Sequence, residues 1–320
     1  MYQVKNASDF REEARKALKG NWWIGAIVAL VAMILGASTL FNATTIGDGG
    51  ILSSVTEELP LYPAYQQGIV LIFGIVVSVV VFLINLAIFL IAGAVTLGYI
   101  QFNFKILNGE KPKFKDLFSQ FKRFGEGLSV HFFRWLFVTL WTLAGVGVAV
   151  VIMIPFVILF VFIQAGEAFF MVICGGLGVA AGIFVFIKML DYVLAPYIVY
   201  DNPGIGGREA LKKSKRLMNG NKGRLFGLTL SFIGWGLLAN LPYMICFLFW
   251  KDAILFSIPL CVGGLWLKAY QEVAYAAFYK QVVAEDNGTI LSNDGPKEYV
   301  LGKGNLDEVE SVVQTSRWNY

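Results

Sequence analysis

The 320-residue chain is poor in charge, in cysteine and in histidine. Charged residues make up only 15% of the sequence, against about 25% in an ordinary soluble domain, whereas 57% of the residues are hydrophobic. This composition excludes a disordered chain, a coiled coil, a collagen and a disulfide-stapled scaffold. Because several apolar runs reach about 18 residues or more, we expect an integral membrane protein.

Catalytic and metal-binding chemistry has few residues available in this sequence. The three cysteines, Cys174, Cys246 and Cys261, all lie in apolar runs, and their odd number argues against a disulfide framework. The single histidine, His131, excludes the metal-binding and catalytic patterns that need two. Phosphate-binding loops, paired carboxylates and nucleophile elbows do not occur. We therefore predict no cofactor, no metal and no catalytic residue, and we expect that the protein is not an enzyme.

Six apolar runs are long enough to cross a membrane. They are Trp22–Phe41, Gly68–Ile100, Val130–Ile163, Ala168–Tyr200, Leu225–Trp250 and Ala253 to about Val283. At about 1.5 Å per residue, a helix of about twenty residues spans a hydrocarbon core of about 30 Å. Four of the runs have about 30 residues or more, so their helices must tilt, bend or project beyond the bilayer. Pro155 and Pro196 are the expected bends.

The positions of the basic residues predict the orientation of the chain. Of the 26 Lys and Arg residues, 18 lie before the first span, after the second and after the fourth. The intervening segment 42–67 has none and is acidic, and the turn 164–167 also has no basic residue. Because cytoplasmic loops carry an excess of Lys and Arg, both termini are predicted to be cytoplasmic.

A short amphipathic stretch that ends in glycine precedes each pair of spans. The closing glycines are Gly20, Gly125 and Gly220. We interpret this pattern as a threefold internal repeat of an interfacial amphipathic helix, a glycine corner and a transmembrane hairpin. The units cover about 7–103, 113–200 and 203–283. The predicted fold is all-α, with six transmembrane helices as three hairpins in one membrane domain, 1–283, followed by a polar and flexible cytoplasmic tail, 284–320.

The basic side chains of these stretches are the predicted binding surface for anionic lipid or for a protein partner. They are Arg15, Lys16, Lys19, Lys122, Arg123, Lys212, Lys213, Lys215 and Arg216. An amphipathic helix would lie on the inner leaflet with its apolar face buried there, helped by about 1 kcal/mol per basic residue near anionic lipid. A topogenic anchor, a docking surface and a lipid headgroup sensor all remain open. A nucleic-acid patch is disfavoured, because the basic residues are spread over three segments beside the membrane.

Few ionisable residues lie inside the predicted spans, and each is costly in hydrocarbon. Lys188 and Asp191 are three residues apart, and Lys268 and Glu272 are four apart, so each pair shares a helical face and is able to form an ion pair. One interpretation is structural pairing near the inner interface, and the other is a proton or ion path. Arg134, near the start of the third span, is expected to be an interfacial anchor.

Small and aromatic residues predict how the helices pack and where they leave the membrane. Gly178 with Gly182, and Gly223 with Gly227, form two G-x-x-x-G patterns that are typical of close helix contacts. Tyrosines are expected at the inner interface as an aromatic belt. These are Tyr99, Tyr197, Tyr200, Tyr275 and Tyr279.

Four motifs together resemble an uncharacterised bacterial family of multi-pass membrane proteins, domain of unknown function 975. They are R-E-E-A-R-K-A-L-K-G-N-W-W at Arg11–Trp23, D-N-P followed by E-A-L-K-K-S-K-R-L-M-N-G-N-K within Asp201–Lys222, L-S-F-I-G-W at Leu230–Trp235 and A-A-F-Y at Ala276–Tyr279. The resemblance extends to about Val283. One departure is Ala269, where the family pattern has a proline, so the bend expected there is in doubt.

The resemblance implies a bacterial plasma-membrane protein without an established activity. The chain is also distantly similar to the membrane portion of certain glycerophosphodiester phosphodiesterases, whose catalytic domain it lacks. Together these favour a non-catalytic membrane component that binds lipid or a partner. A small transporter or channel that uses the intramembrane charge pairs is the alternative.

Overall fold

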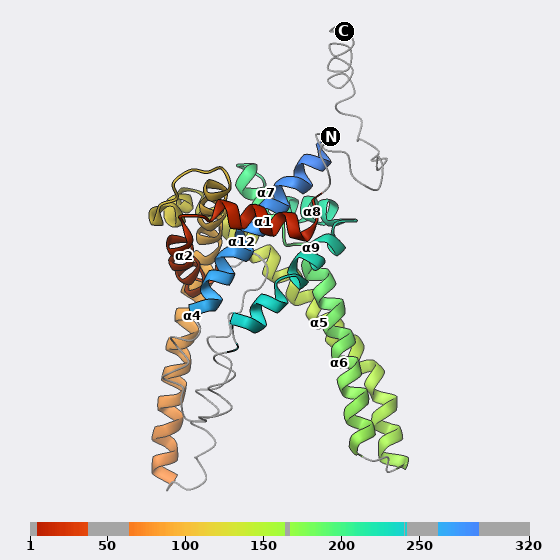
Figure 1. Ribbon diagram of the computed structural model, residues 1–320. Coiled ribbons are helices and arrows are strands. Elements are labelled where there is room, and N and C mark those ends of the chain that lie inside the picture. The colour runs from red at the N-terminus through yellow and green to blue at the C-terminus, as the bar shows by residue number, and fades with distance from the viewer. Residues whose placement is uncertain (1–4, 38–63, 164–166, 240, 242–261, 288–320) are drawn as a thin grey trace, which may run out of the picture. The chain divides into compact units, whose positions relative to one another are not determined.

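The computed structural model describes residues 5–37, 64–163, 167–239, 241 and 262–287, and regular secondary structure within them is all helical (Figure 1). The helices are α1 (Ala7–Ala17), α2 (Trp22–Ile34), α4 (Ala64–Leu107), the 3-10 helix η2 (Phe114–Arg123), α5 (Phe124–Ile163), α6 (Glu167–Leu190), α7 (Ala195–Asp201), α8 (Gly207–Met218), α9 (Lys222–Leu230) and α12 (Val262–Asp286). The chain divides into a unit of residues 5–283, described below, and a second unit of residues 1–4 and 284–320. The predicted all-α class is confirmed for the described residues.

Three helices of the described part are long and apolar enough to cross a membrane. They are Ile72–Leu107, Phe114–Val157 and Met171–Asp201. A fourth candidate exists if α1 and α2, which meet at 107°, form one broken span. Two of the expected spans lie partly outside the described residues, namely Leu225–Trp250 and Ala253–Val283. Most of the predicted tail, 284–320, also lies outside them.

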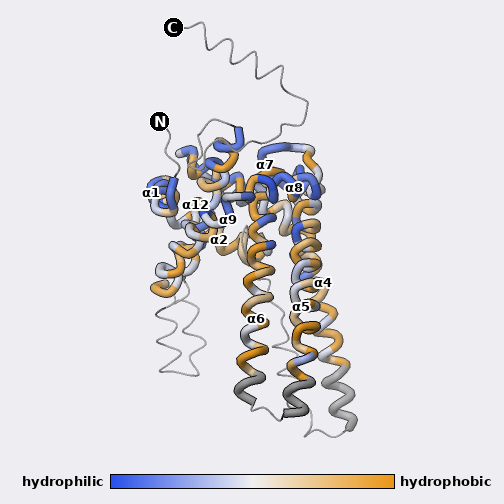
Figure 2. Tube along the Cα trace, turned by 90° about the vertical axis from the view of Figure 1, so that its right-hand side faces the viewer, coloured by the Kyte–Doolittle hydropathy of each residue, from blue (hydrophilic) through white to orange (hydrophobic). Residues whose placement is uncertain are grey.

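Each of the three long candidate spans has one buried end and one exposed, apolar length. Large apolar side chains stay exposed along α4 from Ile72 to Leu90 and along α6 from Met171 to Ile187. Figure 2 shows these lengths in the hydrophobic colour. The buried core lies at the other end, where the last turns of α4 pack against α7 and α12. Apolar surface of this extent is typical of helices that face lipid.

Two of the three predicted glycine corners are confirmed. Gly20 (φ 88°) ends the segment of α1, and Gly220 (φ 82°) ends that of α8, both in the left-handed region that favours glycine. The next residues hydrogen bond alike: the Asn21 N–H donates to the Leu18 carbonyl at 2.8 Å, and the Asn221 N–H donates to the Met218 carbonyl at 3.1 Å. The two corners, 200 residues apart in sequence, therefore share one local geometry.

The third corner, predicted at Gly125, does not form. Phe124 has helical dihedral angles (φ −51°, ψ −46°), so η2 continues directly into α5, and Gly125 lies in the first turn of that helix. The amphipathic segment itself is a 3-10 helix rather than the predicted α-helix. Its apolar residues Phe118, Phe121 and Phe124 recur every three positions, which is the period of a 3-10 helix.

The first predicted span is interrupted by glycine. α2 has only 13 residues and ends at Ile34, before the expected end at Phe41. Gly36 has a φ of 71°, and the Ala37 N–H donates to the Ala32 carbonyl at 2.7 Å, which closes the helix in a Schellman arrangement. At about 1.5 Å per residue, α2 alone is shorter than a hydrocarbon core.

Proline interrupts the fourth predicted span as expected. α6 ends at Leu190, and α7 begins at Ala195 after a turn. Pro196 occupies the first turn of α7, where its missing N–H costs no helical hydrogen bond. The helix is therefore broken just before Pro196, where a bend is predicted, whereas α5 continues through Pro155 as a single helix.

The apolar faces of α1 and α8 pack against protein, contrary to the expectation that they lie in the leaflet. Phe10 of α1 is fully buried and meets the ring of Phe278 edge to face at 5.6 Å. On α8, the apolar residues Ala210, Leu211, Leu217 and Met218 are all buried. Burial of these faces stabilises the fold, so this apolar area is covered by protein rather than by lipid.

Closely packed helices in this protein meet at glycines other than those of the G-x-x-x-G patterns. A Cβ atom at Gly93 of α4 would lie 2.2 Å from the Gly127 carbonyl oxygen of α5, and one at Gly98 would lie 1.9 Å from the Leu117 carbonyl oxygen of η2. By contrast, a Cβ atom at Gly178 or at Gly182 would meet nothing within 4 Å among the described residues, and the same holds for the second pattern. Among the described residues, the contacts predicted from the G-x-x-x-G spacing are therefore not present.

We expect Gly98→Ala to destabilise the fold by about 1–3 kcal/mol, because the new methyl group displaces the backbone at Leu117. Gly178→Ala is the matched control, since it adds the same methyl group to an open helical site. Thermal unfolding in detergent should show a lower Tm for the first variant only. Equal Tm values for both variants would contradict the close contact.

Candidate anion-binding site

Helix α8 places three cationic side chains on one of its faces. Lys212, Lys215 and Arg216 are exposed and lie three and four residues apart, which aligns them along the helix. The opposite face is held in the core by its apolar residues and by Ser214, whose hydroxyl donates to the Asp191 carbonyl oxygen at 2.8 Å. The basic face therefore points away from the core.

A surface pocket of about 410 Å³ opens beside this basic face. It is lined by Asp191, Lys212, Lys215, Arg216, Asn219 and Lys222. Asp191, directly after α6, is only 2% exposed, and its carboxylate oxygen lies 2.6 Å from the Lys222 ammonium at the start of α9. The floor of the pocket is thus fixed by contacts among the end of α6, α8 and α9.

The pocket, which we call the α8 pocket, carries an excess of positive charge. Lys222 balances the single carboxylate among the lining residues, Asp191, and the lining also contains Lys212, Lys215 and Arg216. Within the described residues, Lys212 and Lys215 form no ion pair. Ammonium and guanidinium groups converging on one space are suited to a phosphate or carboxylate anion. The arrangement can therefore bind an anionic group.

The other predicted binding residues do not join this pocket. Lys213 does not line the pocket, and it interacts electrostatically with Asp201. Lys16 of α1 lies 2.7 Å from Glu12, and this hydrogen-bonded ammonium lowers the pKa of the Glu12 carboxyl. The remaining members Arg15, Lys19 and Lys122 are exposed. Of the predicted binding residues, the structure brings together Lys212, Lys215 and Arg216 at this pocket and leaves the others outside it.

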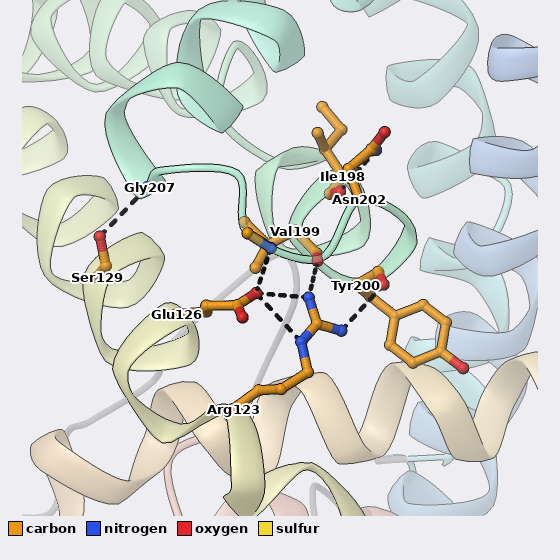
Figure 3. A network of polar contacts seen from close by, with 9 residues as sticks. Arg123, Glu126, Ser129, Ile198, Val199, Tyr200, Asn202 and Gly207 are labelled. Carbon is orange, nitrogen blue, oxygen red and sulfur yellow. Dashed lines mark hydrogen bonds and ion pairs between the residues drawn. The ribbon is translucent and has the colours of Figure 1, made fainter.

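Arg123 joins the start of α5 to the end of α7 (Figure 3). Its Nε and Nη2 atoms donate to one carboxylate oxygen of Glu126, at 3.1 and 2.6 Å. Its Nη1 atom donates to the Tyr200 carbonyl at 3.1 Å, and Nη2 donates to the Val199 carbonyl. A guanidinium bound to the last carbonyls of a helix is a favourable cap. The donors of Arg123 are therefore engaged within the protein.

The same start of α5 also holds the loop that leads into α8. The Glu126 oxygen that binds Arg123 accepts the Gly204 N–H at 3.2 Å, and the Ser129 hydroxyl accepts the Gly207 N–H at 3.2 Å (Figure 3). A Cβ atom at Gly207 would lie 2.6 Å from the Ser129 hydroxyl oxygen, so α8 begins where only glycine fits. These contacts set the position of the basic face of α8.

The intramembrane charge pairs are only partly as predicted. Lys268 and Glu272 form the expected ion pair at 2.8 Å. Lys188 and Asp191 do not pair: the Lys188 ammonium lies 4.3 Å from the ring centroid of Trp141, whereas Asp191 pairs with the distant Lys222. Helical spacing allows an ion pair between Lys188 and Asp191, but it cannot show that Lys222, on another helix, binds Asp191 instead.

A buried polar cluster surrounds Glu272, which is 0% exposed. Arg134, expected at the interface, is instead buried and interacts electrostatically with Glu272 and Tyr197. Tyr99 interacts with the same carboxylate from α4. The predicted aromatic belt is thus largely core, because Tyr99, Tyr197, Tyr275 and Tyr279 are buried. Sequence reasoning missed their role, since hydropathy alone does not separate interfacial from buried tyrosines.

Metal ligation has no matching arrangement in the part of the chain that the structure describes. No group of three His, Cys, Asp or Glu side chains there is placed to hold an ion. The ring of His131 packs edge to face on Phe89 at 4.9 Å. Cys174 is free and half-buried, and the other two cysteines lie outside the described residues.

Comparison with known proteins gives a family match over most of the chain. The profile of a family described as protein of unknown function (DUF975) matches residues 1–286. No curated protein and no solved structure gives a significant match. The expected similarity to glycerophosphodiester phosphodiesterases therefore has no support from these comparisons. The matched residues include both glycine corners, Arg123 and the α8 pocket.

We expect Arg123→Gln to lower the stability of the fold by about 1.5–3 kcal/mol, because it removes charged hydrogen bonds from partly buried carbonyl and carboxylate groups. Lys122→Gln removes the same charge one position earlier from an exposed side chain and should leave stability unchanged. Thermal unfolding of both variants in detergent checks this. A similar Tm for the two variants would show that the hydrogen bonds of Arg123 do not stabilise the fold.

Proposed function

We propose that this chain, which belongs to the DUF975 family of proteins of unknown function, is a non-catalytic membrane protein that binds anionic lipid headgroups at the α8 pocket. The observation that carries the proposal is the convergence of Lys212, Lys215 and Arg216 beside the closed Asp191–Lys222 pair. This leaves net positive charge at a rigid, open surface. Phosphate groups are the anions that membranes present in quantity.

The proposal places the protein in the bacterial plasma membrane with both termini in the cytoplasm. Six spans in three hairpins, arranged as a threefold repeat, complete this topology. It is supported by the 18 basic residues in alternate segments and by the matching corners at Gly20 and Gly220. In this orientation the α8 pocket faces the cytoplasmic leaflet, which is the anionic one.

The location of α8 favours lipid over an acidic protein as the ligand. The pocket includes Asp191, directly after the apolar helix α6, so it lies where the chain leaves the hydrophobic length (Figure 2). A lipid headgroup occupies that same level. A cytoplasmic protein would have to approach the membrane surface to reach it, and lipid binding by the purified protein distinguishes the two.

The alternative of a small transporter or channel receives less support. It depends on charged groups inside the spans, and these have partners within the protein: Lys268 with Glu272, and Asp191 with Lys222. Lys188 rests on an aromatic ring. Such matched charges offset the burial cost without a transported ion.

We expect the triple variant Lys212→Gln, Lys215→Gln and Arg216→Gln to bind phosphatidylglycerol roughly 100-fold more weakly, at about 1 kcal/mol per basic residue. The measurement is native mass spectrometry of the detergent-purified protein, titrated with phosphatidylglycerol or with neutral phosphatidylcholine.

The matched control removes three charges in and directly after α1 by Arg15→Gln, Lys16→Gln and Lys19→Gln. This variant should lose less than about tenfold in affinity, because only Lys16 of the three lines a pocket, and that pocket also contains Asp9, Glu12 and Glu13. Equal losses in both variants would show that binding follows net charge and would contradict the α8 pocket. An unchanged preference for phosphatidylglycerol in the α8 variant would contradict it as well.

The topology makes a separate prediction. In a variant without native cysteines, Ser54→Cys should react with a membrane-impermeant maleimide in intact spheroplasts. Lys111→Cys and Arg208→Cys should react only after lysis, because positive segments stay inside. Reaction of Ser54→Cys and Lys111→Cys from the same side would contradict the proposed orientation.

A further inference from the structure

The three amphipathic segments differ in what covers their apolar faces. The faces of α1 and α8 are buried in the protein. Along η2 and its junction with α5, four phenylalanines stay 36–43% exposed, and we call them the phenylalanine stripe. They are Phe114, Phe118, Phe121 and Phe124. One of three segments with similar composition therefore retains an apolar face outside the fold.

The other side of η2 is anchored, so the stripe has a fixed direction. Leu117 is completely buried, and its carbonyl lies against Gly98 of α4. Asp116 is buried too: its carboxylate lies 2.9 Å from the Lys105 ammonium and accepts the Lys113 N–H at 2.8 Å. Rotation of η2 about its axis would break these contacts, so the phenylalanines cannot turn inward.

The 3-10 geometry gathers the stripe into one continuous surface. With three residues per turn, Phe118, Phe121 and Phe124 lie in a row along the helix. The rings of Phe114 and Phe118 are 5.9 Å apart, and so are those of Phe118 and Phe121. Ring contacts at this distance are favourable, and they keep the stripe together as a unit.

The surroundings of the stripe match a lipid interface. η2 continues without a break into α5, whose next exposed aromatics are Phe132 and Trp135, so the stripe lies at the start of the exposed apolar length of this candidate span. Exposed lysines flank it, at positions Lys111, Lys113, Lys115 and Lys122. The acid of η2, Asp116, points into the protein. Aromatic rings with flanking lysines are typical of segments at the boundary between headgroups and acyl chains.

We propose that the phenylalanine stripe is inserted into the headgroup–acyl boundary of the leaflet at this end of α5, and that α1 and α8 are not. η2 is therefore the lipid-embedded anchor among the three segments, whereas α8 presents only charge. The inference rests on the proposed membrane insertion, but not on lipid binding at the α8 pocket.

Site-directed fluorescence tests this placement. In a variant without native cysteines, Phe118→Cys and, separately, Phe114→Cys are labelled with an environment-sensitive NBD probe. Arg208→Cys, on α8 outside the pocket, and Lys19→Cys after α1 are the exposed controls. Each protein is reconstituted into liposomes of phosphatidylglycerol and phosphatidylcholine at a low protein-to-lipid ratio, with or without acyl-chain spin-labelled lipid.

Both η2 positions should emit at shorter wavelength than the controls, and spin-labelled lipid should quench them several-fold more strongly. Emission and quenching equal to those of the Arg208→Cys control would overturn the proposal. A shift to shorter wavelength that appears only at a high protein-to-lipid ratio would assign the stripe to contact with a second copy of the chain. This result would also overturn the proposal. Loss of binding at the α8 pocket leaves these readouts unchanged, so the two proposals fail separately.

Discussion

The close approach of α4 to η2 and to the start of α5 is the contact on which the rest of this end of the molecule depends. It exists because Gly93, Gly98 and Gly127 have no side chain between the backbones. Once η2 lies against α4, Arg123 reaches the carbonyls at the end of α7, and Glu126 holds the following loop. That loop leads into α8 and positions this helix with Lys212, Lys215 and Arg216 facing outward. A few missing methyl groups therefore determine both the direction of the phenylalanine stripe and the position of the α8 pocket.

Sequence patterns predicted the all-helical class of the described residues, but not what those helices contact. Apolar periodicity located α1 and α8, and glycine marked their ends at Gly20 and Gly220. The same periodicity cannot show whether an apolar face meets lipid or protein, because both are equally apolar partners. The three-residue spacing of Phe118, Phe121 and Phe124 was a readable sign of a 3-10 helix. Gly125, which directly follows Phe124, was instead interpreted as the end of an amphipathic α-helix.

The charged residues show a similar division between what sequence does and does not predict. The pair Lys268–Glu272 lies within one helix, so its spacing was sufficient. The partner of Asp191 is on α9, and two helices, α7 and α8, lie between them in the chain, so no local pattern contains that information. The α8 pocket was therefore only half predictable: three cations of its face follow from helical spacing, whereas its closed floor depends on tertiary structure.

The hydrogen bond from the Tyr270 hydroxyl to the Arg11 carbonyl, which joins α12 to α1, has a consequence for biogenesis. Its partners are 259 residues apart in the chain. At a synthesis rate of about 5–20 residues per second, α1 waits roughly 13–50 s for α12 to be made. Phe10 is without Phe278 throughout that interval. The nascent α1 therefore has an uncovered apolar face beside the membrane, and lipid can hold this helix at the surface until protein replaces it.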